Sequence, residues 1–270
     1  MEATANSGTI CVCGMTLEYR AFGRGSRRSP MIVMLHEGLG SIDTWGEFPR
    51  RLSESTETRV MAYSRPGYGA SPPFGRALSI DYIRHHALTV LPKILEAIKF
   101  QRGMLLGHSD GASMVAAYAG SVRDPRVTGL VLMAPHFVVE PENLAEIRNA
   151  REAYTDRDLR QRLSRYHANV DVAFWGWNNV WLEPAFAHFD LRDELAKIRV
   201  PMLIIRGNDD RYGTNRQVAI AKEKCQCQLE ALIIPNCGHI PHRQQPELVL
   251  NAITAFYQNV DSRLVKPRSL

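Results

Sequence analysis

The stretch Gly107-His108-Ser109-Asp110-Gly111 decides the fold of this chain, because it joins two segments of different type. The apolar run 103–106 precedes it, and the small-residue stretch 112–119 follows it. This order predicts a buried strand, a tight turn and a helix. The two glycines lack the Cβ atoms that would collide where the strand and the helix cross. Ser109 can therefore occupy a strained turn, with its hydroxyl projecting from the sheet.

Two later stretches supply the partners that a reactive serine needs, a base and an acid that orients the base. The apolar run 201–206 reads as a buried strand and ends in Gly207-Asn208-Asp209-Asp210. The apolar run 231–235 reads as a further strand, and His239 follows it. In an open parallel sheet the carboxyl ends of the strands meet at one edge, where active sites form. Ser109, an aspartate and His239 are therefore expected to meet there.

With this order of serine, acid and histidine, the chain resembles the α/β-hydrolase fold superfamily, and in it the serine hydrolases with a helical cap. The likeness runs over about residues 14–257. It includes Leu35-His36-Glu37-Gly38-Leu39-Gly40-Ser41, in the place of the family's His-Gly oxyanion loop, and Tyr63-Ser64-Arg65-Pro66-Gly67-Tyr68-Gly69-Ala70-Ser71, similar to the loop after the next parallel strand. The resemblance implies Ser109 as the nucleophile and His239 as the base. The family's spacing, three residues after a glycine, selects Asp210 as the acid.

The remaining histidines and the second aspartate have structural interpretations. His242 competes with His239 for the role of the base, but the position of His239 after a glycine favours His239. Asp209 is expected to cap the turn. His36 and His108 are expected to hydrogen-bond loop backbone beside the site, whereas His85 and His86 are expected on the surface.

The resemblance also places the oxyanion hole at the backbone N–H groups of Gly38 and Asp110. Two side chains depart from the family's pattern here, because Glu37 stands in place of a glycine and Asp110 in place of an apolar or amide residue. In the simpler interpretation Asp110 caps its own helix. In the other, Glu37 and Asp110 form a hydrogen-bonded clasp between the two loops, and at least one of them is protonated, bonded to its neighbour or paired with Arg65.

Continuous apolar runs that alternate with helical patterns predict a mostly parallel, eight-stranded sheet with helices on both faces. A hairpin over residues 10–22 turns at Gly14 and supplies two of the strands. The other strands are expected at 31–35, 60–63, 104–106, 130–133, 202–205 and 232–234. Helices are expected at 45–52, 80–98, 112–119, 216–224 and 247–259, with Pro92 kinking or dividing the second of them.

The strand pattern stops over residues 135–199, which are helical and aromatic. We therefore expect a hydrolase core formed by residues 1–134 and 200–270 and a small helical cap formed by 135–199. The cap holds Trp175, Trp177 and Trp181, which are candidates for lining the substrate pocket as well as for the cap's own core.

Composition excludes several classes of protein. An apolar content of 45% and a charged content of 23% are ordinary for a globular protein, and no apolar run reaches the length of a membrane helix. The net charge of +5 comes from dispersed basic residues without a nucleic-acid-binding motif. We therefore expect a cytoplasmic protein with reduced cysteines, no metal, no cofactor and no nucleic-acid or membrane partner. Whether the protein forms a homodimer stays open.

The resemblance implies hydrolysis of a small or medium carboxylic ester or lactone through an acyl-serine intermediate. Two alternatives stay open: hydrolysis of a carbon–carbon bond in a ring-cleavage diketone, whose anionic charge arginines could bind, and a non-catalytic receptor for a small ligand. Chemistry with an aspartyl nucleophile, as in epoxide and haloalkane hydrolysis, is disfavoured because Ser109 and not Asp110 holds the central position of the turn.

Overall fold

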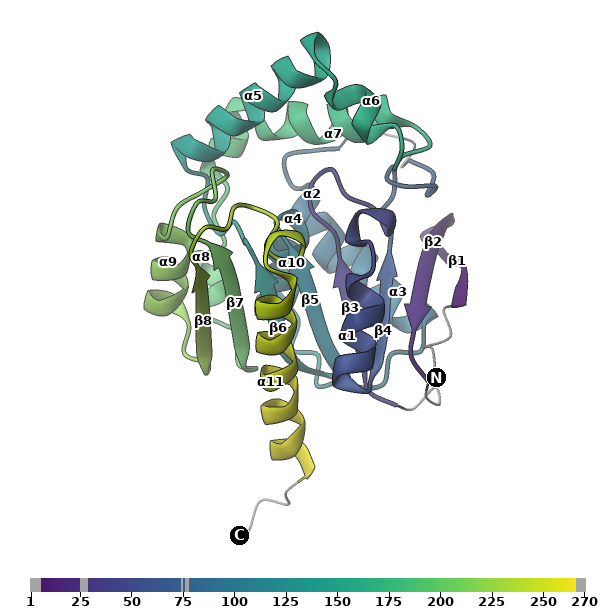
Figure 1. Ribbon diagram of the computed structural model, residues 1–270, viewed down its shortest axis with the longest axis vertical. Coiled ribbons are helices and arrows are strands. Elements are labelled where there is room, and N and C mark those ends of the chain that lie inside the picture. The colour runs from purple at the N-terminus through teal and green to yellow at the C-terminus, as the bar shows by residue number, and fades with distance from the viewer. Residues whose placement is uncertain (1–5, 25–28, 74, 76–77, 266–270) are drawn as a thin grey trace.

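An eight-stranded sheet forms the centre of the protein (Figure 1). The structure is a computed structural model that describes residues 6–24, 29–73, 75 and 78–265. The strand order is β1-β2-β4-β3-β5-β6-β7-β8, and the pairs β1–β2 and β2–β4 are antiparallel while the others are parallel. The strands are β1 (Asn6–Val12), β2 (Met15–Phe22), β3 (Met31–Leu35), β4 (Arg59–Tyr63), β5 (Gly103–His108), β6 (Val127–Met133), β7 (Met202–Gly207) and β8 (Leu229–Ile234). The predicted mostly parallel sheet is confirmed.

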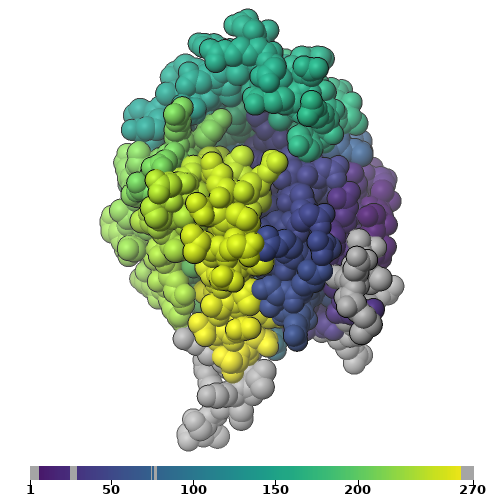
Figure 2. All heavy atoms as spheres, viewed as in Figure 1, coloured from purple at the N-terminus to yellow at the C-terminus, as the bar shows by residue number. Residues whose placement is uncertain are grey.

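Each central strand is apolar on both faces because helices cover both sides of the sheet. On β3, Ile32 and Met34 pack with α1 (Phe48–Thr56) and α11 (Pro246–Val265), which lie side by side in front of the sheet (Figures 1 and 2).

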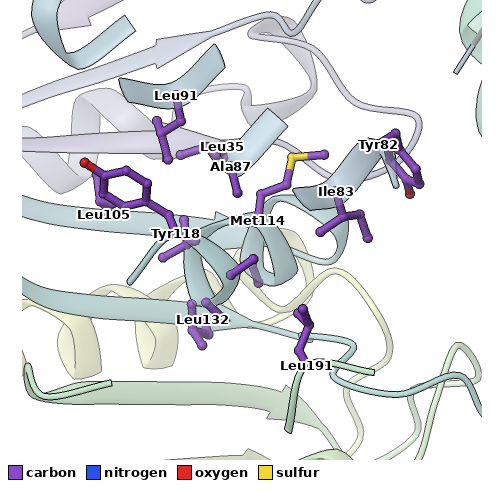
Figure 3. Packing of buried hydrophobic residues seen from close by; sticks show 14 of the residues in the cluster. Leu35, Tyr82, Ile83, Ala87, Leu91, Leu105, Met114, Tyr118, Leu132 and Leu191 are labelled. Carbon is purple, nitrogen blue, oxygen red and sulfur yellow. The ribbon is translucent and has the colours of Figure 1, made fainter. Parts of the chain in front are cut away.

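The alternate residues of β3, Val33 and Leu35, belong to the core behind the sheet. The helices of that core include α2 (Tyr82–His85), α3 (Leu91–Ala97), α4 (Asp110–Ser121), α8 (Arg192–Leu195) and α9 (Arg216–Lys224). Figure 3 shows Leu35 and Leu105 from the sheet close to Ala87, Leu91, Met114 and Tyr118 of these helical segments. The two cores cover both faces of the sheet, so its carboxyl edge is where a site can form.

Two of the predicted helices are divided. The pattern over 45–52 becomes a short 3-10 turn, Asp43–Trp45, and then α1, because Gly46 between them has a φ of 57°. The pattern over 80–98 becomes α2, a π-helical segment His86–Val90 and α3. Pro92 has no N–H to donate to the preceding turn, so a break just before it agrees with the expected division.

Three helices lie over the carboxyl edge of the sheet (Figure 1): α5 (Pro141–Asp156), α6 (Leu159–Leu163) and α7 (Val170–Trp181). We call them the cap helices. Residues 135–199 are all described and contribute no strand to the sheet, only an isolated bridge between Val138 and Asp190. The division into a core of 1–134 and 200–270 and a cap of 135–199 stays a prediction. In the described part of the chain, no helix has both the length and the apolarity needed to cross a bilayer.

Candidate active site

The turn between β5 and α4 holds Ser109 in a strained backbone conformation, with φ 53° and ψ −119°. Such a conformation costs a non-glycine residue about 1–3 kcal/mol and persists only where the surroundings enforce it. A Cβ atom at Gly107 would lie 2.3 Å from the Gly111 carbonyl oxygen, and one at Gly111 would lie 2.2 Å from the Leu35 carbonyl oxygen. The two glycines therefore permit the close crossing of strand and helix that was predicted from their spacing.

Ser109, His239 and Asp210 form one hydrogen-bonded chain. The Ser109 Oγ atom lies 3.0 Å from His239 Nε2, and His239 Nδ1 lies 2.9 Å from Asp210 Oδ1. Asp210 is buried, whereas Asp209 is exposed and its backbone N–H donates to the Cys237 carbonyl in the turn. A carboxylate only accepts, so the proton of the neutral imidazole is on Nδ1 and Nε2 can accept the proton of Ser109.

The surroundings of Asp210 keep its carboxyl group ionised. Burial acts against the charge, but the hydrogen bond and charge of His239, and the charge of Arg206, outweigh it and lower the pKa of Asp210 to about 2. Its Oδ1 atom also accepts a hydrogen bond of 2.8 Å from the backbone N–H of Tyr212, and Arg206 Nη1 lies 3.6 Å from Oδ2. Arg206 is fully buried at the end of β7, and it was not predicted from the sequence, where it is the last residue of an apolar run.

A second histidine contacts Ser109, and it too was not predicted from the sequence. His136 Nε2 lies 3.3 Å from Ser109 Oγ, and the His136 ring stacks on that of His239 with 5.6 Å between their centroids. The residue is 2% exposed and follows the end of β6. The rule that placed the acid and the base at strand ends would also have placed His136 at this edge.

The two residues predicted to form the oxyanion hole line the same cavity as Ser109. Asp110 is the first residue of α4, so its backbone N–H has no partner within the helix and adds to the positive end of the helix dipole. Gly38 lies directly under the cap, because a Cβ atom there would be 2.1 Å from Nε1 of Trp177 on α7. Their roles as oxyanion donors stay predictions.

The expected clasp between Glu37 and Asp110 is wrong, because each carboxyl group has a different partner. Glu37 Oε2 lies 3.4 Å from His108 Nδ1. Burial alone would raise the pKa of Glu37, but the adjacent His108 imidazole outweighs burial and the pKa lies below its usual range. Asp110 accepts a 2.5 Å hydrogen bond from the Tyr82 hydroxyl, which in turn accepts one from Trp181 Nε1.

Asp110 also does not cap its helix. Ser109 occupies the N-cap position and Asp110 the first helical position, and the Asp110 carboxyl group accepts its hydrogen bond from the Tyr82 hydroxyl on α2. Burial raises the pKa of the Asp110 carboxyl group, although Arg65 and Tyr82 act in the opposite direction. Among the described residues, the buried Asp110 Oδ1 atom has no hydrogen-bond partner. The direction of this shift favours the protonated form of Asp110, and the expected protonation of one of the two acids stays a prediction.

The histidines beside the site support its loops. The His36 imidazole donates through Nδ1 to the Glu37 carbonyl at 2.8 Å and accepts from the Arg65 backbone N–H at 2.9 Å. Arg65 is buried and donates through Nη2 to the same Glu37 carbonyl at 2.6 Å, so it binds the loop's backbone and not a carboxylate. His108 Nε2 lies 2.7 Å from the His239 carbonyl. The expected contacts of His36 and His108 with loop backbone are confirmed.

Two further histidine assignments have definite outcomes. His242 is 3% exposed and packs against Trp45 with 4.8 Å between the ring centroids, whereas it is His239 that contacts Ser109. The surface position expected for His86 is wrong: it is 4% exposed, and its Nε2 lies 2.7 Å from the Tyr63 hydroxyl.

A cavity of about 490 Å³ opens onto Ser109 beneath the cap helices. Of the three tryptophans expected there, Trp177 and Trp181 line it, and they lie four residues apart on one face of α7. Trp175 does not line it, because a shift of two residues turns a side chain about 200° around a helix. Trp175 packs against Tyr154 and Phe174 within the cap instead.

Comparisons with known proteins agree with this architecture. The chain is 27% identical over 229 residues to the bifunctional esterase/perhydrolase of Acinetobacter calcoaceticus, covering 73% of this chain and 80% of the relative. It is 25% identical over 279 residues to the 2-hydroxy-6-oxononadienedioate/2-hydroxy-6-oxononatrienedioate hydrolase 2 of Pseudomonas putida, covering 91% of this chain and 92% of the relative. The names of these relatives describe an esterase/perhydrolase and a hydrolase of a dioate.

The fold has solved counterparts. The crystal structure of the enol-lactonase from Burkholderia xenovorans LB400 superposes with a TM-score of 0.72 at 20% identity, over 92% of this chain and 99% of that one. The profile of the alpha/beta hydrolase family matches residues 32–252, which include the serine turn, the acid and the histidine. The chain therefore belongs to the alpha/beta hydrolase family.

Proposed function

We propose that this protein is a serine hydrolase that cleaves a small or medium carboxylic ester or lactone through an acyl-serine intermediate. The observation that carries the proposal is the hydrogen-bonded chain from Ser109 Oγ through His239 to the Asp210 carboxylate at the floor of a cavity. A hydroxyl bonded to an oriented, neutral imidazole is the arrangement that activates serine for attack on a carbonyl.

In the proposed reaction, His239 Nε2 takes the Ser109 proton while Oγ attacks the carbonyl carbon. The backbone N–H groups of Gly38 and Asp110 donate to the developing oxyanion, and the N-terminus of α4 adds positive potential. His239 then protonates the departing oxygen. Water, activated by the same imidazole, releases the acyl group, while Asp210 stabilises the imidazolium formed in each step.

The size and the lining of the cavity support a substrate of limited size. A volume of about 490 Å³ lies within the range of small-molecule sites. Much of the wall comes from apolar side chains of the cap helices and the core, among them Leu39, Ile147, Trp177 and Ile240. Such a wall suits an acyl or alkoxy group with hydrocarbon character.

The test is turnover of p-nitrophenyl esters of increasing chain length and of simple lactones by the purified protein and by Ser109→Ala. We expect turnover by the wild type and a loss of at least about 10³-fold in the variant, because triad members act as a unit. A fluorophosphonate probe should label the wild type and leave Ser109→Ala unlabelled. Labelling of the alanine variant would refute the assignment of the nucleophile, and binding without turnover would favour a receptor.

A second candidate is hydrolysis of a carbon–carbon bond in an anionic ring-cleavage diketone. The observation that favours it is a set of three exposed arginines at the wall of the cavity: Arg162, Arg165 and Arg243. A guanidinium group matches the geometry of a carboxylate and can bind it through two hydrogen bonds. The Pseudomonas relative described above carries a dioate in its name. Including such a diketone in the panel decides between the two candidates, because faster turnover of the diketone than of any ester would select this one.

A further inference from the structure

We propose that His136 is a further catalytic residue, which donates a hydrogen bond from Nε2 to Ser109 Oγ and stabilises that oxygen when it leaves the acyl-enzyme. This inference rests on the proposed acyl-serine mechanism. His136 is not part of the hydrogen-bonded chain of Ser109, His239 and Asp210.

The neighbours of His136 determine which of its ring nitrogens carries the proton. Asn143 Oδ1 faces the backbone N–H of Glu140 at 2.5 Å, and Asn143 Nδ2 faces the Tyr212 carbonyl. The opposite amide orientation would place oxygen against oxygen and N–H against N–H, so the orientation is determined. Asn143 Nδ2 also lies 3.2 Å from His136 Nδ1. An amide NH₂ group only donates, so Nδ1 accepts and the proton is on Nε2.

The Nε2–H group is therefore a donor that faces Ser109 Oγ at 3.3 Å. The single proton of the Ser109 hydroxyl goes to His239 Nε2, so Oγ has lone pairs free to accept. His136 cannot serve as a second base, because the nitrogen that faces Oγ already holds a proton. It is also not poised as an acid, because burial, together with the charge of His239, lowers the pKa of His136 to about 3.

The position of the imidazole is fixed from its backbone outward. The His136 carbonyl accepts a 2.7 Å hydrogen bond from Ser113 Oγ on α4, the helix that begins beside Ser109. The next residue, Phe137, donates from its backbone N–H to Gln217 Oε1 at 2.7 Å. On the ring itself, Trp181 packs edge-on with 5.3 Å between the centroids. A donor held this rigidly needs no reorganisation when charge develops on Oγ.

The step that uses this donor is the breakdown of the acyl-enzyme. His239 Nε2 takes a proton from water, and the hydroxide oxygen forms a bond to the acyl carbon. When the tetrahedral intermediate collapses, the carbon–Oγ bond breaks and its electron pair moves to Oγ, which recovers a proton from His239. His136 keeps its own proton and donates a hydrogen bond to Oγ as negative charge accumulates there. In acylation the same hydrogen bond occupies a lone pair of the attacking oxygen, so it assists that step less.

The experiment measures acylation and deacylation separately, by stopped-flow hydrolysis of p-nitrophenyl acetate. In His136→Phe we expect deacylation to slow by about 10–100-fold, the worth of a hydrogen bond to a charged oxygen, while acylation changes by less than about threefold. The acetyl-enzyme should then accumulate, visible as a burst of p-nitrophenol and as an acetyl adduct in the intact mass. His136→Gln retains an N–H donor and should restore most of the deacylation rate.

The matched control is His242→Phe, which removes a buried imidazole that does not contact Ser109. It should leave the ratio of acylation to deacylation unchanged. If His136→Phe does not fold, His136→Met supplies a flexible side chain without a donor. A fall of both rate constants together in the His136 variants, or deacylation within about threefold of the wild type, would overturn the proposal.

A measurement without substrate separates this proposal from the proposed function. In ¹⁵N-histidine NMR spectra of the wild type near pH 7, the ring of His136, assigned by its loss in His136→Gln, should carry its proton on Nε2. A proton on Nδ1 would overturn the proposal even if esters are hydrolysed. If the Nε2 proton is present but neither esters nor a fluorophosphonate react with Ser109, the acyl-serine mechanism is wrong, and the catalytic role of His136 is refuted with it.

Discussion

Acidification should unfold this protein at a mildly acidic pH, because it buries neutral imidazoles. Burial, with smaller contributions from neighbouring cations, lowers the pKa of several histidines, among them His167, and it does so strongly for four, in two cases to about 3: His36, His86, His136 and His242. In the unfolded chain each titrates near pH 6.5. Since the folded pKa values are the lower ones, this contribution to stability is fully present above about pH 6.5 and is lost as the pH falls toward the folded values.

The size of the effect follows from linkage. Each such histidine lowers the free energy of unfolding by about 1.4 kcal/mol per pH unit below its unfolded pKa, which amounts to about 2 kcal/mol at pH 5 relative to pH 7.5. The four together give a loss of about 8 kcal/mol. Folded domains are typically stable by only about 5–15 kcal/mol, so the midpoint of acid unfolding should lie near pH 5.

The assay is urea unfolding followed by tryptophan fluorescence between pH 7.5 and 5. His86→Gln should flatten the pH dependence by about one proton, or about 1.4 kcal/mol per pH unit, because His86 is buried and its ring nitrogen faces the Tyr63 hydroxyl and not the Ser109 hydroxyl. The control is His188→Gln, since His188 is exposed to solvent in the folded protein. A total loss below about 2 kcal/mol over this range, or an unchanged slope in His86→Gln, would refute the reasoning.

Three further predictions concern the site. Asp210→Asn should lower turnover of p-nitrophenyl esters by about 10⁴-fold through the wrong histidine tautomer, while Asp209→Asn should stay within about threefold; the reverse ranking would make Asp209 the acid. Glu37→Gln should retain most of the ester turnover, whereas Glu37→Ala should lower both the turnover and the thermal midpoint. The same turnover and midpoint in both variants would contradict a role for a polar side chain at position 37. Tyr82→Phe should destabilise the protein by about 1–3 kcal/mol in urea unfolding, because the buried Asp110 carboxyl group loses the hydrogen bond from the Tyr82 hydroxyl. An unchanged midpoint would argue against that bond.

Features encoded by local sequence could be predicted well. The two glycines around Ser109 are required by the close packing of the turn, and each buried parallel strand is a continuous apolar run. The turn and the strands can therefore be recognised without the structure. The acid and the histidine could be placed because both follow such runs directly. Even the break before Pro92 follows from the chemistry of one residue.

Features that depend on packing between distant segments could not be predicted. Arg206 and His136 carry no motif. The strand-end rule reaches the edge where His136 lies, but only the fold shows that its Nε2 is 3.3 Å from Ser109 Oγ and that Arg206 Nη1 is 3.6 Å from Asp210 Oδ2. Glu37 was placed correctly in its loop, but nothing in the sequence shows that His108 and not Asp110 faces it. Each of these errors concerns a polar partner and not the position of a backbone segment.

The tight contact between Gly38 and Trp177 links the evolution of the cap to that of the core. Because a side chain at position 38 would occupy the space of the indole, the two positions can change only in a compensating pair, a larger residue on one side requiring a smaller one on the other. A cap transplanted from a relative would therefore succeed only if it brings a side chain of matching volume at position 177. Changes of substrate range that involve position 177 are therefore limited by the space available above Gly38.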